Sequence, residues 1–434
     1  MPRPHSHPYF SLLARPVTLA LWAGQLVSEA GSMLHDMAML WVVHEMTGSA
    51  GAMSAVKLAS YLPVAVVGLV GGALVDRWHR LRALVLIDLC RALVVATLPL
   101  LYLKGLLSPW ALAASGLVLA TLDGFFVPAL QSSLPALVPP RHLPGAHALL
   151  DSTDRLARLL GPGLSSLVLT VVPLVHFFTL NALSFLISAL AFGFILLRLG
   201  THPVVRPSGP REPLGWRDLL AGWLQIRSDR LLASALAVRG ICNVPWAIYT
   251  IGAPLLVAEK FRQSPGAWGL IIAAYGTASL AGNLLAGSLG LGQPGRPVYR
   301  PFALSWMFTG LGFGGVGLAP SLHLATAAAF VAGLGSPVVH IVLDSYIGLT
   351  VPVAVRGRVF AVQRLVVSGM HMVGLGLAGW VLSRLAPDAG IAVAGAALVG
   401  ISLCALVHAR LQGLDRIRAG DHPTDSAATA GAAG

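Results

Sequence analysis

Residues 71–82 read GGALVDRWHRLR and form a short basic segment with a single acid, Asp76, between two long apolar stretches, residues 51–75 and 83–103. Each stretch is long enough for a helix that crosses a bilayer, which takes about 20 apolar residues. A bilayer offers no partner to exposed backbone groups, so such stretches cross it as helices. This part of the sequence therefore predicts a helical membrane protein.

Similar apolar stretches follow one another along almost the whole 434-residue chain, separated by short polar loops. The fold that we expect is an all-α polytopic membrane protein with twelve transmembrane helices in two six-helix bundles. The expected spans are roughly residues 17–44, 51–75, 83–103, 109–131, 148–172, 174–198, 231–258, 265–291, 301–319, 321–347, 359–384 and 389–411.

The composition agrees with this fold, since 56% of the residues are hydrophobic and 11% are charged. A net charge of +12 would suggest a nucleic-acid partner in a soluble protein, but the basic residues lie in alternate short loops. By the positive-inside rule, this predicts a multi-pass protein of the cell (inner or plasma) membrane with both termini in the cytoplasm. We expect contact with membrane lipid, no nucleic acid, and a monomer. The basic residues left for the outer loops are Lys104, Lys260, Arg262 and Arg384.

A Pro- and Arg-rich stretch, GTHPVVRPSGPREPLGW at residues 200–216, divides the spans into two groups of six and is typical of a linker. Residues 132–149 align weakly with residues 345–362, which predicts two pseudo-symmetric bundles around a central site. The expected domains are a cytoplasmic N-terminal segment (1–16), an N-terminal six-helix bundle (17–198), a cytoplasmic linker (199–230), a C-terminal six-helix bundle (231–411) and a disordered cytoplasmic tail (412–434).

The first span carries a polar stripe, because Gln25, Glu29, Ser32 and Asp36 fall at positions i, i+4, i+7 and i+11 on one helical face. Carboxylates at membrane depth are costly and usually face a bundle interior or a wet cavity. Burial disfavours the charged form, which lets such a group bind and release protons. Glu29 and Asp36 are therefore candidate proton carriers. The alternative is that they form fixed ion pairs with Lys57 or Arg239.

The seventh span repeats this spacing with Arg239, Asn243, Trp246 and Thr250. Arg239 either neutralises an acid of the first span or binds an anionic group directly. With Gln25, Ser32 and Lys57, these side chains are candidates to line the substrate cavity. Asp123 in span four and Asp344 in span ten lie near the cytoplasmic ends of their helices and are either further substrate contacts or water-accessible structural carboxylates. A local helix pair suffices to explain Asp88 and Arg91, which we assign to packing near the inner gate.

Several chemistries have no motif in the sequence. Cys90, Cys242 and Cys404 lie far apart, without the paired spacing of a metal or redox site. No lysine stands in a phosphate-binding loop, and no nucleophile–base arrangement stands out. We therefore expect neither an enzyme nor a cofactor or metal.

The membrane potential is a source of energy that needs no such motif. A proton that enters the cell gains about 2.3 kcal/mol per 100 mV, which is enough to drive modest uphill export.

Two motifs resemble those of a known family. Gly72, Leu74, Asp76, Arg77 and Arg80 match the loop signature between the second and third helices of major facilitator superfamily transporters, with His79 in place of its second glycine. The segment LGPGLSS at 160–166 resembles the helix-five signature of the family's drug and metabolite antiporters through Gly161 and Pro162, but Ser165 and Ser166 replace its final glycines. The wider pattern is similar to the enterobactin-exporter and macrolide-efflux branch.

The resemblance implies a cytoplasmic gate. In the family's loop signature the acid, here Asp76, contacts the start of a helix in the opposite half, here near Gly357 and Arg358. A carboxylate fits that role, because it accepts hydrogen bonds from a helix N-terminus. The alternative is that Asp76 and its arginines anchor the loop at the lipid headgroups.

The combined expectation is a secondary active transporter that uses alternating access. It would export a small amphiphilic or hydrophobic compound, such as a drug, a siderophore or a metabolite, in exchange for protons. Two alternatives are a metabolite uniporter or importer, whose buried charges are fixed ion pairs, and a non-transporting membrane scaffold or sensor on the same fold.

Overall fold

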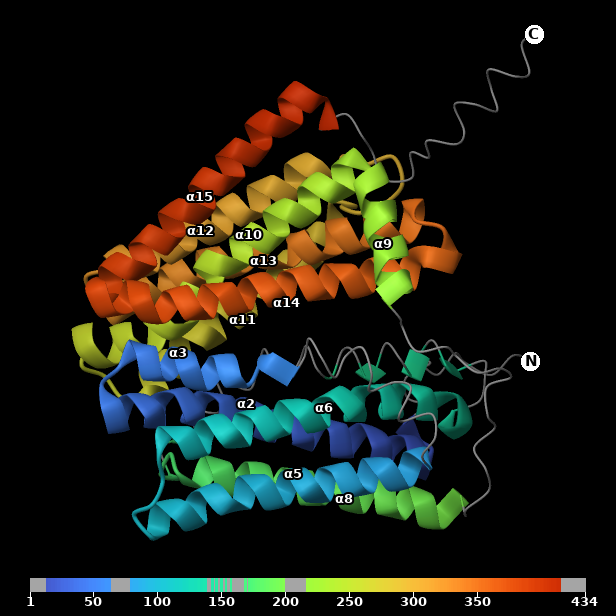
Figure 1. The fold of residues 1–434 in the computed structure, drawn as a ribbon, viewed down its shortest axis with the longest axis vertical. Helices are drawn as coiled ribbons and strands as arrows, with labels where there is room; N and C mark the ends of the chain where they lie inside the picture. Colours follow the sequence, from blue (N-terminus) through green and yellow to red (C-terminus); the bar gives the residue numbers. More distant parts are fainter. Residues whose placement is uncertain are drawn as a thin grey trace, which may run out of the picture. The chain divides into compact units, whose positions relative to one another are not determined.

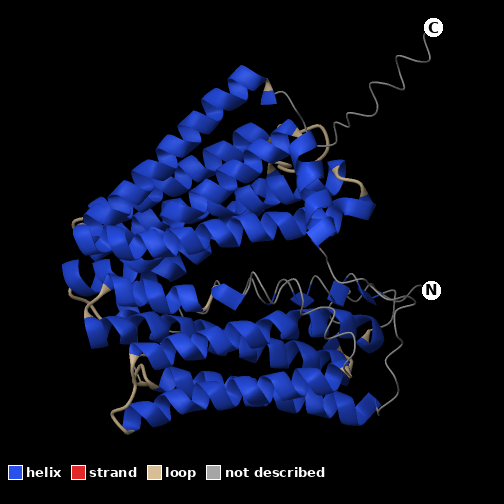
Figure 2. Cartoon of the chain, in the orientation of Figure 1, coloured by secondary structure: helices blue, strands red, loops and turns tan. Residues whose placement is uncertain are grey.

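The computed structural model describes residues 13–63, 79–138, 171–199 and 216–414, with a few single positions between 142 and 169. Figure 2 shows that these residues form helices joined by short loops, with no strand among them. The chain separates into two compact units, residues 1–213 with 264–273, and residues 214–263 with 274–434. The fold is that of an all-α polytopic membrane protein.

The first unit contains the helices of the N-terminal half. Figure 1 shows α2 and α8 packed together, with α5 against α8 and α6 against α5, as the residue contacts also indicate. The bounds are α2 (Pro16–Thr47), α3 (Ala50–Ala59), α5 (Arg80–Leu103), α6 (Pro109–Leu137) and α8 (His176–Leu199).

The second unit is built mainly from α10, α12, α13, α14 and α15. Among its helices, α12 packs on both α13 and α15, and α10 packs on α14. Its bounds are α9 (Trp216–Ser228), α10 (Arg230–Leu255), the π-helix η2 (Leu256–Lys260), α11 (Pro265–Ser288, of which 265–273 belong to the first unit), α12 (Tyr299–Leu318), α13 (Leu322–Thr350), α14 (Val353–Arg384) and α15 (Pro387–Gln412).

Local sequence signals fix where several helices begin. The side chains of Ser49, Ser108, Asp229 and Ser321 each accept a hydrogen bond from a backbone N–H in the first turn of α3, α6, α10 or α13. Such caps satisfy amides that have no partner inside the helix. Proline in the first turn of α2, α6 and α15 serves the same end, because it has no N–H to satisfy.

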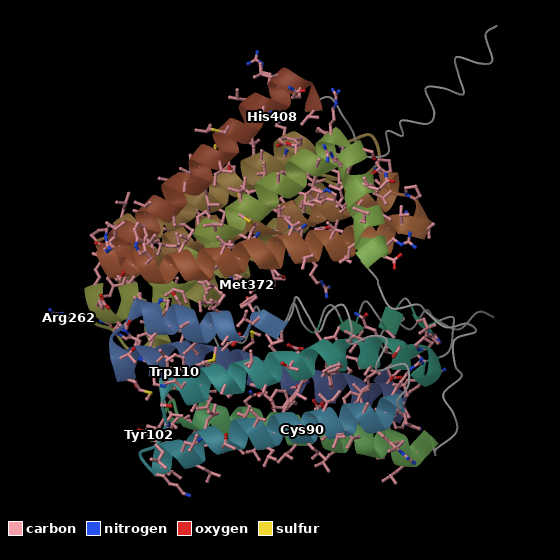
Figure 3. All side chains as sticks on the ribbon, in the orientation of Figure 1. Cys90, Tyr102, Trp110, Arg262, Met372 and His408 are labelled. Carbon is pink, nitrogen blue, oxygen red and sulfur yellow. The ribbon has the colours of Figure 1, made fainter. Side chains whose placement is uncertain are left out.

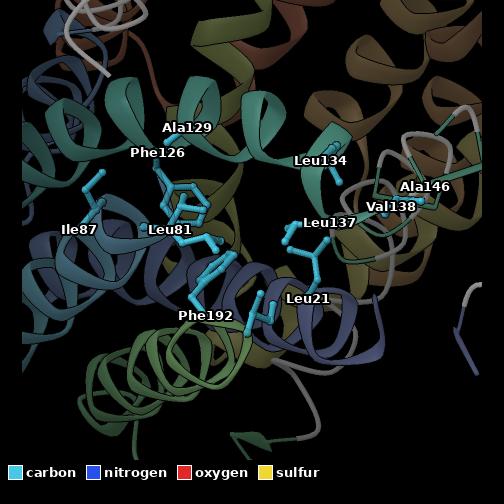
Figure 4. Close-up of a cluster of buried hydrophobic side chains, with 12 residues drawn as sticks. Leu21, Leu81, Ile87, Phe126, Ala129, Leu134, Leu137, Val138, Ala146 and Phe192 are labelled. Atoms are coloured by element: carbon cyan, nitrogen blue, oxygen red, sulfur yellow. The ribbon is translucent and has the colours of Figure 1, made fainter. Parts of the chain in front are cut away.

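The core of the first unit lies where α2, α5, α6 and α8 meet. Phe126 of α6 packs edge-on against Phe192 of α8, with ring centroids 5.9 Å apart. Aliphatic side chains fill the space around these rings (Figure 4), and this close packing fixes how the helices are rotated about their axes. The buried set is Leu21, Leu81, Leu84, Ile87, Phe126, Ala129, Leu134, Leu137, Val138, Ala146, Phe192 and Ile195.

The outer surface suits a bilayer. Within the described part of the chain, nine helices are long and apolar enough to cross a membrane. Their outward faces carry large exposed apolar side chains, such as Leu93 and Leu190. Figure 3 labels Tyr102 and Trp110 where α5 ends and α6 begins, and both side chains are exposed. Exposed Tyr and Trp at one end of a bundle are typical of a membrane–water interface.

Most helix bounds differ from the predicted spans by three residues or fewer, but two differ by six. The fourth span was predicted to end at residue 131, and α6 continues to Leu137. The eleventh was predicted to begin at residue 359, and α14 begins at Val353, so that Gly357 and Arg358 lie inside its first turns. The α14 extension carries two arginines, Arg356 and Arg358, which lower its hydropathy, and the α6 extension contains Ser132, Ser133 and Pro135, which are typical of a helix end. Most of span five and the end of span two lie outside the described residues.

The segment predicted as a linker, residues 199–230, contains a helix that we did not predict. Helix α9 packs against α14 in the second unit. Gly222 makes this approach close, because a Cβ there would stand 2.7 Å from the carbonyl oxygen of Arg358. Asp218 also pairs with the Arg358 guanidinium at 2.9 Å. The segment thus contains an element anchored to one unit.

Candidate functional site

The first unit contains a partly open polar cavity of about 330 Å³. Gln25, Glu29, Ser32 and Asp36, the polar stripe predicted for the first span, all lie in its lining on α2. The other walls come from α3, α5, α6 and α8. The helical spacing of the stripe therefore places its members on one face, and that face is turned toward a cavity inside the bundle.

An ion pair joins α2 and α3 at this cavity. Lys57 Nζ lies 3.0 Å from Asp36 Oδ1, and the lysine side chain is largely buried while the aspartate opens onto the cavity. Of the two partners considered for the acids of the first span, Lys57 is thus paired with Asp36. Arg239 is paired with Asp344 instead.

A second charged cluster contributes Arg91 and Asp123 to the cavity lining. Arg91 of α5 donates to Asp88 Oδ1 at 3.0 Å, and its other nitrogen pairs with Asp123 of α6. Its guanidinium also lies 4.0 Å from the centre of the Phe126 ring and 5.5 Å from that of Phe185. One cation therefore contacts two carboxylates, Asp88 buried in the unit and Asp123 exposed at the cavity, which is a more connected arrangement than a local helix pair.

Two sequence expectations change at this cluster. Asp123 was predicted near a helix end, but it lies at the midpoint of α6 because that helix is longer than predicted. Arg91 was assigned to packing, but it lines the cavity. The sequence did contain a signal that Arg91 belongs to the site, because an arginine and an aspartate stand in the middle of an apolar span. The contact with Asp123 has no sequence signal, since it depends on how α5 and α6 are rotated against each other.

The remaining lining residues are apolar, and some of their side chains are flexible. Met33 and Met39 of α2, Leu119 of α6 and the rings of Phe126 and Phe185 border the polar groups. Methionine side chains adapt their shape and contact aromatic groups favourably. A cavity that combines an apolar surface with a few fixed polar groups is suited to bind an amphiphilic molecule.

The second unit contains its own charged cluster, which joins three helices. Arg239 of α10 donates to Asp344 Oδ1 at 3.2 Å and contacts His340 Nδ1 at 2.6 Å. Gln363 of α14 donates to the same Asp344 oxygen at 2.9 Å. Asn243 donates to the backbone oxygen of Arg239. The Arg239 guanidinium is thus held by groups of its own unit.

Trp246, one turn beyond Asn243, lies in an aromatic cluster of the second unit. It makes edge contacts with Tyr275 and Trp306, and its ring lies 5.3 Å from that of Phe313. Tyr249 stacks on Phe313 with centroids 3.7 Å apart. These rings pack on one another, so the structure presents Trp246 as part of a packed aromatic group.

The predicted gate is described only in part. Gly72, Asp76 and Arg77 lie outside the described residues, as do Gly161 and Pro162 of the helix-five motif. Arg80 begins α5 and donates to the backbone oxygen of Ser132, which ties the start of α5 to the end of α6. Arg358 pairs with Asp218 of α9. The contact expected between Asp76 and the start of α14 stays a prediction.

Metal chemistry has no support in the part of the chain that the structure describes, where no three His, Cys, Asp or Glu side chains are grouped to hold an ion. The three cysteines are unpaired, and Cys242 is buried. The cavity is therefore described by its charges, its hydrogen-bonding groups and its apolar surface alone.

Comparison with known proteins identifies the class. The family model of transmembrane secretion effectors matches residues 8–426, and the chain belongs to this family of major facilitator superfamily transporters. It is similar to macrolide efflux protein A of Streptococcus pyogenes, at 23% identity over 89% of this chain and 95% of the relative. The enterobactin exporter of Shigella boydii is 28% identical over 78% of this chain and 79% of the relative. The protein is thus a multi-pass membrane transporter and no enzyme.

A solved structure supports the same fold. The nucleoside transporter NupG superposes with a TM-score of 0.69, covering 90% of this chain and 98% of that one at 11% identity. At this level of identity the likeness concerns the fold. The predicted family is confirmed, and so is the predicted major facilitator fold.

Proposed function

We propose that the protein exports a small amphiphilic or hydrophobic compound in exchange for protons, by alternating access. The relatives named for macrolide efflux and enterobactin export support the outward direction. A drug, a siderophore or a secreted metabolite is the class of substrate. The polar cavity of the first unit is the proposed site for both substrate and proton.

The observation that carries proton coupling is the balance of charge in this cavity. Among its described lining residues, the acids Glu29, Asp36 and Asp123 outnumber the bases Lys57 and Arg91. With these five groups ionised and His35, which also lines the cavity, neutral, the lining holds an uncompensated negative charge inside a membrane protein, which is costly. A bound proton removes that charge. A cavity of this kind therefore takes up protons readily.

Glu29 and Asp36 have different parts in this proposal. A proton on Asp36 would cancel its attraction to Lys57 and free the ammonium group, so that protonation there changes the α2–α3 contact. A proton on Glu29 would change the charge of the cavity next to Gln25 and Ser32. Either acid links proton binding to the polar wall of the cavity, and the substrate contacts the apolar wall near Phe126 and Phe185.

The test uses purified protein in liposomes. An imposed pH gradient should drive substrate movement, and substrate should drive proton movement, with a panel of lipophilic cations, macrolides and catechol siderophores. Glu29→Gln or Asp36→Asn should reduce coupled proton flux by at least about tenfold, since a positioned proton carrier contributes about 100-fold or more. Whichever variant loses the flux identifies the carrier.

A matched control is available on the same helix. Glu45→Gln makes the same chemical change on an exposed residue of α2 that lies outside the cavity lining, and it should transport like the parent. Substrate flux without proton flux in the parent and in all variants would refute proton coupling. An equal loss of coupled proton flux in Glu45→Gln would indicate that the substitutions disrupt α2 as a whole.

The Asp36–Lys57 pair supports a second candidate function. If this ion pair is fixed, the cavity has one fewer titrating acid, and the protein would act as a uniporter or importer of a metabolite. The same liposomes separate the two functions. A uniporter equilibrates substrate at a rate that does not depend on the pH gradient, whereas the proposed exporter accumulates substrate against its gradient.

A further inference from the structure

The contact between Arg239 and His340 requires a particular form of the histidine. Arg239 Nη2 lies 2.6 Å from His340 Nδ1. Arginine donates hydrogen bonds and accepts none, so the imidazole nitrogen is the acceptor. His340 is therefore neutral in this arrangement and carries its proton on Nε2. A protonated imidazole has no acceptor and would turn a cation toward the guanidinium.

We propose that His340 is a proton-binding residue of the second unit, and that its protonation and its contact with Arg239 exclude each other. In the described part of the chain, two charged groups and one amide belong to the cluster around His340. Arg239 lies on α10 and Asp344 lies one turn away on α13, while α14 contributes the neutral amide of Gln363. Each form of the histidine selects one of the two charged partners.

The neutral form holds Arg239 between His340 and Asp344. The guanidinium is buried, and its two terminal nitrogens are occupied by His340 Nδ1 and Asp344 Oδ1. This arrangement ties α10 to α13. The histidine is exposed on the second unit, whereas the arginine is packed inside it, so a proton from water can reach the histidine.

When His340 is protonated, hydrogen-bond acceptors are available both for its imidazolium and for the Arg239 guanidinium. His340 and Asp344 stand at i and i+4 on α13, a spacing at which a protonated histidine pairs with a carboxylate. Gln363 Oε1 is buried and has no hydrogen-bond partner among the described residues. Its amide and the Arg239 guanidinium already donate to the same Asp344 oxygen, so this acceptor belongs to the same cluster. The guanidinium can therefore turn from His340 to Gln363.

Proton binding at His340 would thus change how α10 is held against α13 and α14. Helix α10 also carries Asn243, whose side chain donates to the Arg239 backbone oxygen, and Trp246 one turn further. The cluster gives the second unit a proton response of its own, separate from the acids of the first unit. Its role in transport rests on the proposed function, but the proton site itself does not.

The first experiment observes the histidine directly. Protein labelled with ¹⁵N-histidine in detergent is titrated from about pH 8 to about pH 5.5, the range in which histidine changes charge. The His340 signal is assigned by its loss in His340→Asn. We expect the neutral form with its proton on Nε2 at the alkaline end, and protonation at a higher pH in Arg239→Gln than in the parent. A proton on Nδ1, or a titration that Arg239→Gln leaves unchanged, would overturn the proposal.

The second experiment asks whether this proton takes part in transport. His340→Asn keeps an acceptor near the Nδ1 position but does not titrate, and His408→Asn makes the same change on the exposed face of α15. We expect the pH dependence of substrate flux to flatten in His340→Asn by up to about tenfold per pH unit, the limit for one titrating group, and to persist in His408→Asn. Unchanged pH dependence in His340→Asn would overturn the role in transport. If the parent moves no substrate at all, the export proposal fails, while the labelled titration still decides the proton site.

Discussion

Arg91 is the positively charged partner of Asp88 in the interior of the first unit. The Asp88 side chain is fully buried, and its charged partner within hydrogen-bond distance is Arg91, which also faces Asp123. Taking two charges out of water is costly, and removal of one partner leaves the other uncompensated. The packed rings of Phe126 and Phe185 around the guanidinium increase that cost by excluding water.

Arg91→Met should therefore destabilise the protein by about 3–5 kcal/mol, the usual cost of breaking a buried ion pair. Thermal unfolding in detergent measures the effect as a lower melting temperature. Arg198→Met is the matched control, because Arg198 stacks on Phe194 at the exposed end of α8, and its loss should change the stability by less than about 0.5 kcal/mol. Partial recovery is expected when Asp88→Asn is added to Arg91→Met, and a further loss of stability would contradict this account.

Some contacts between residues of the candidate site could be predicted from the sequence, and others could not. The stripe from Gln25 to Asp36 is predictable, because helical spacing alone puts its members on one face. The partner of Asp36 was open between Lys57 in the next span and Arg239 in the seventh span, which pseudo-symmetry makes the counterpart of the first. The pairing of Arg91 with Asp123 and of Arg239 with His340 depends on the rotation of packed helices, which no local spacing encodes.

At the scale of elements, small residues set how closely the helices approach. Gly282 of α11 faces the backbone of α13, and a Cβ there would collide with the carbonyl group of Leu334. Helices in membranes associate largely through such close packing, because lipid gives no hydrophobic driving force between them. Gly282 therefore has a packing role that hydropathy does not reveal.

Gly282→Ala should destabilise the α11–α13 contact by about 1–3 kcal/mol, as expected for overpacking. Gly287→Ala is a strict control on the same helix, since a Cβ at that position has no atom within 4 Å. Melting temperatures of the two variants in detergent compare them directly. Equal stability of the two variants would show that α11 and α13 separate without cost.

The predicted spans match most helix bounds and fall short at the end of α6 and at the start of α14. Hydropathy predicted α5, α10, α13 and α15 to within three residues at each end. It missed the start of α14, which carries Arg356 and Arg358, and the whole of α9, a short helix with charged residues at both ends (Arg217, Asp218 and Arg227). Those elements depend on contacts such as Asp218 with Arg358, which lie outside the reach of a sliding window.

At the scale of the whole molecule, the distribution of basic residues predicts which side of the membrane each loop faces. Gly105 follows Lys104 in a loop expected outside, and Ser426 lies in the tail expected in the cytoplasm. With the three native cysteines replaced by serine or alanine, Gly105→Cys should react with a membrane-impermeant thiol reagent in intact cells. Ser426→Cys should react only after the membrane is opened, and the reverse pattern would invert the topology.

Helix α9 has a consequence for how the chain can be interrupted. Because α9 is paired with and packed on α14, the covalent connection between the two units is shorter than the polar composition indicates. A gene split after Ser208 leaves α9 with its own unit, whereas a split after Ser228 attaches it to the other one. Co-expressed fragments 1–208 and 209–434 should co-purify and transport, and fragments 1–228 and 229–434 should do so less well. Whether a cut is tolerated therefore depends on whether α9 stays on the same fragment as α14. Two separately translated polypeptides should then suffice to make one working carrier.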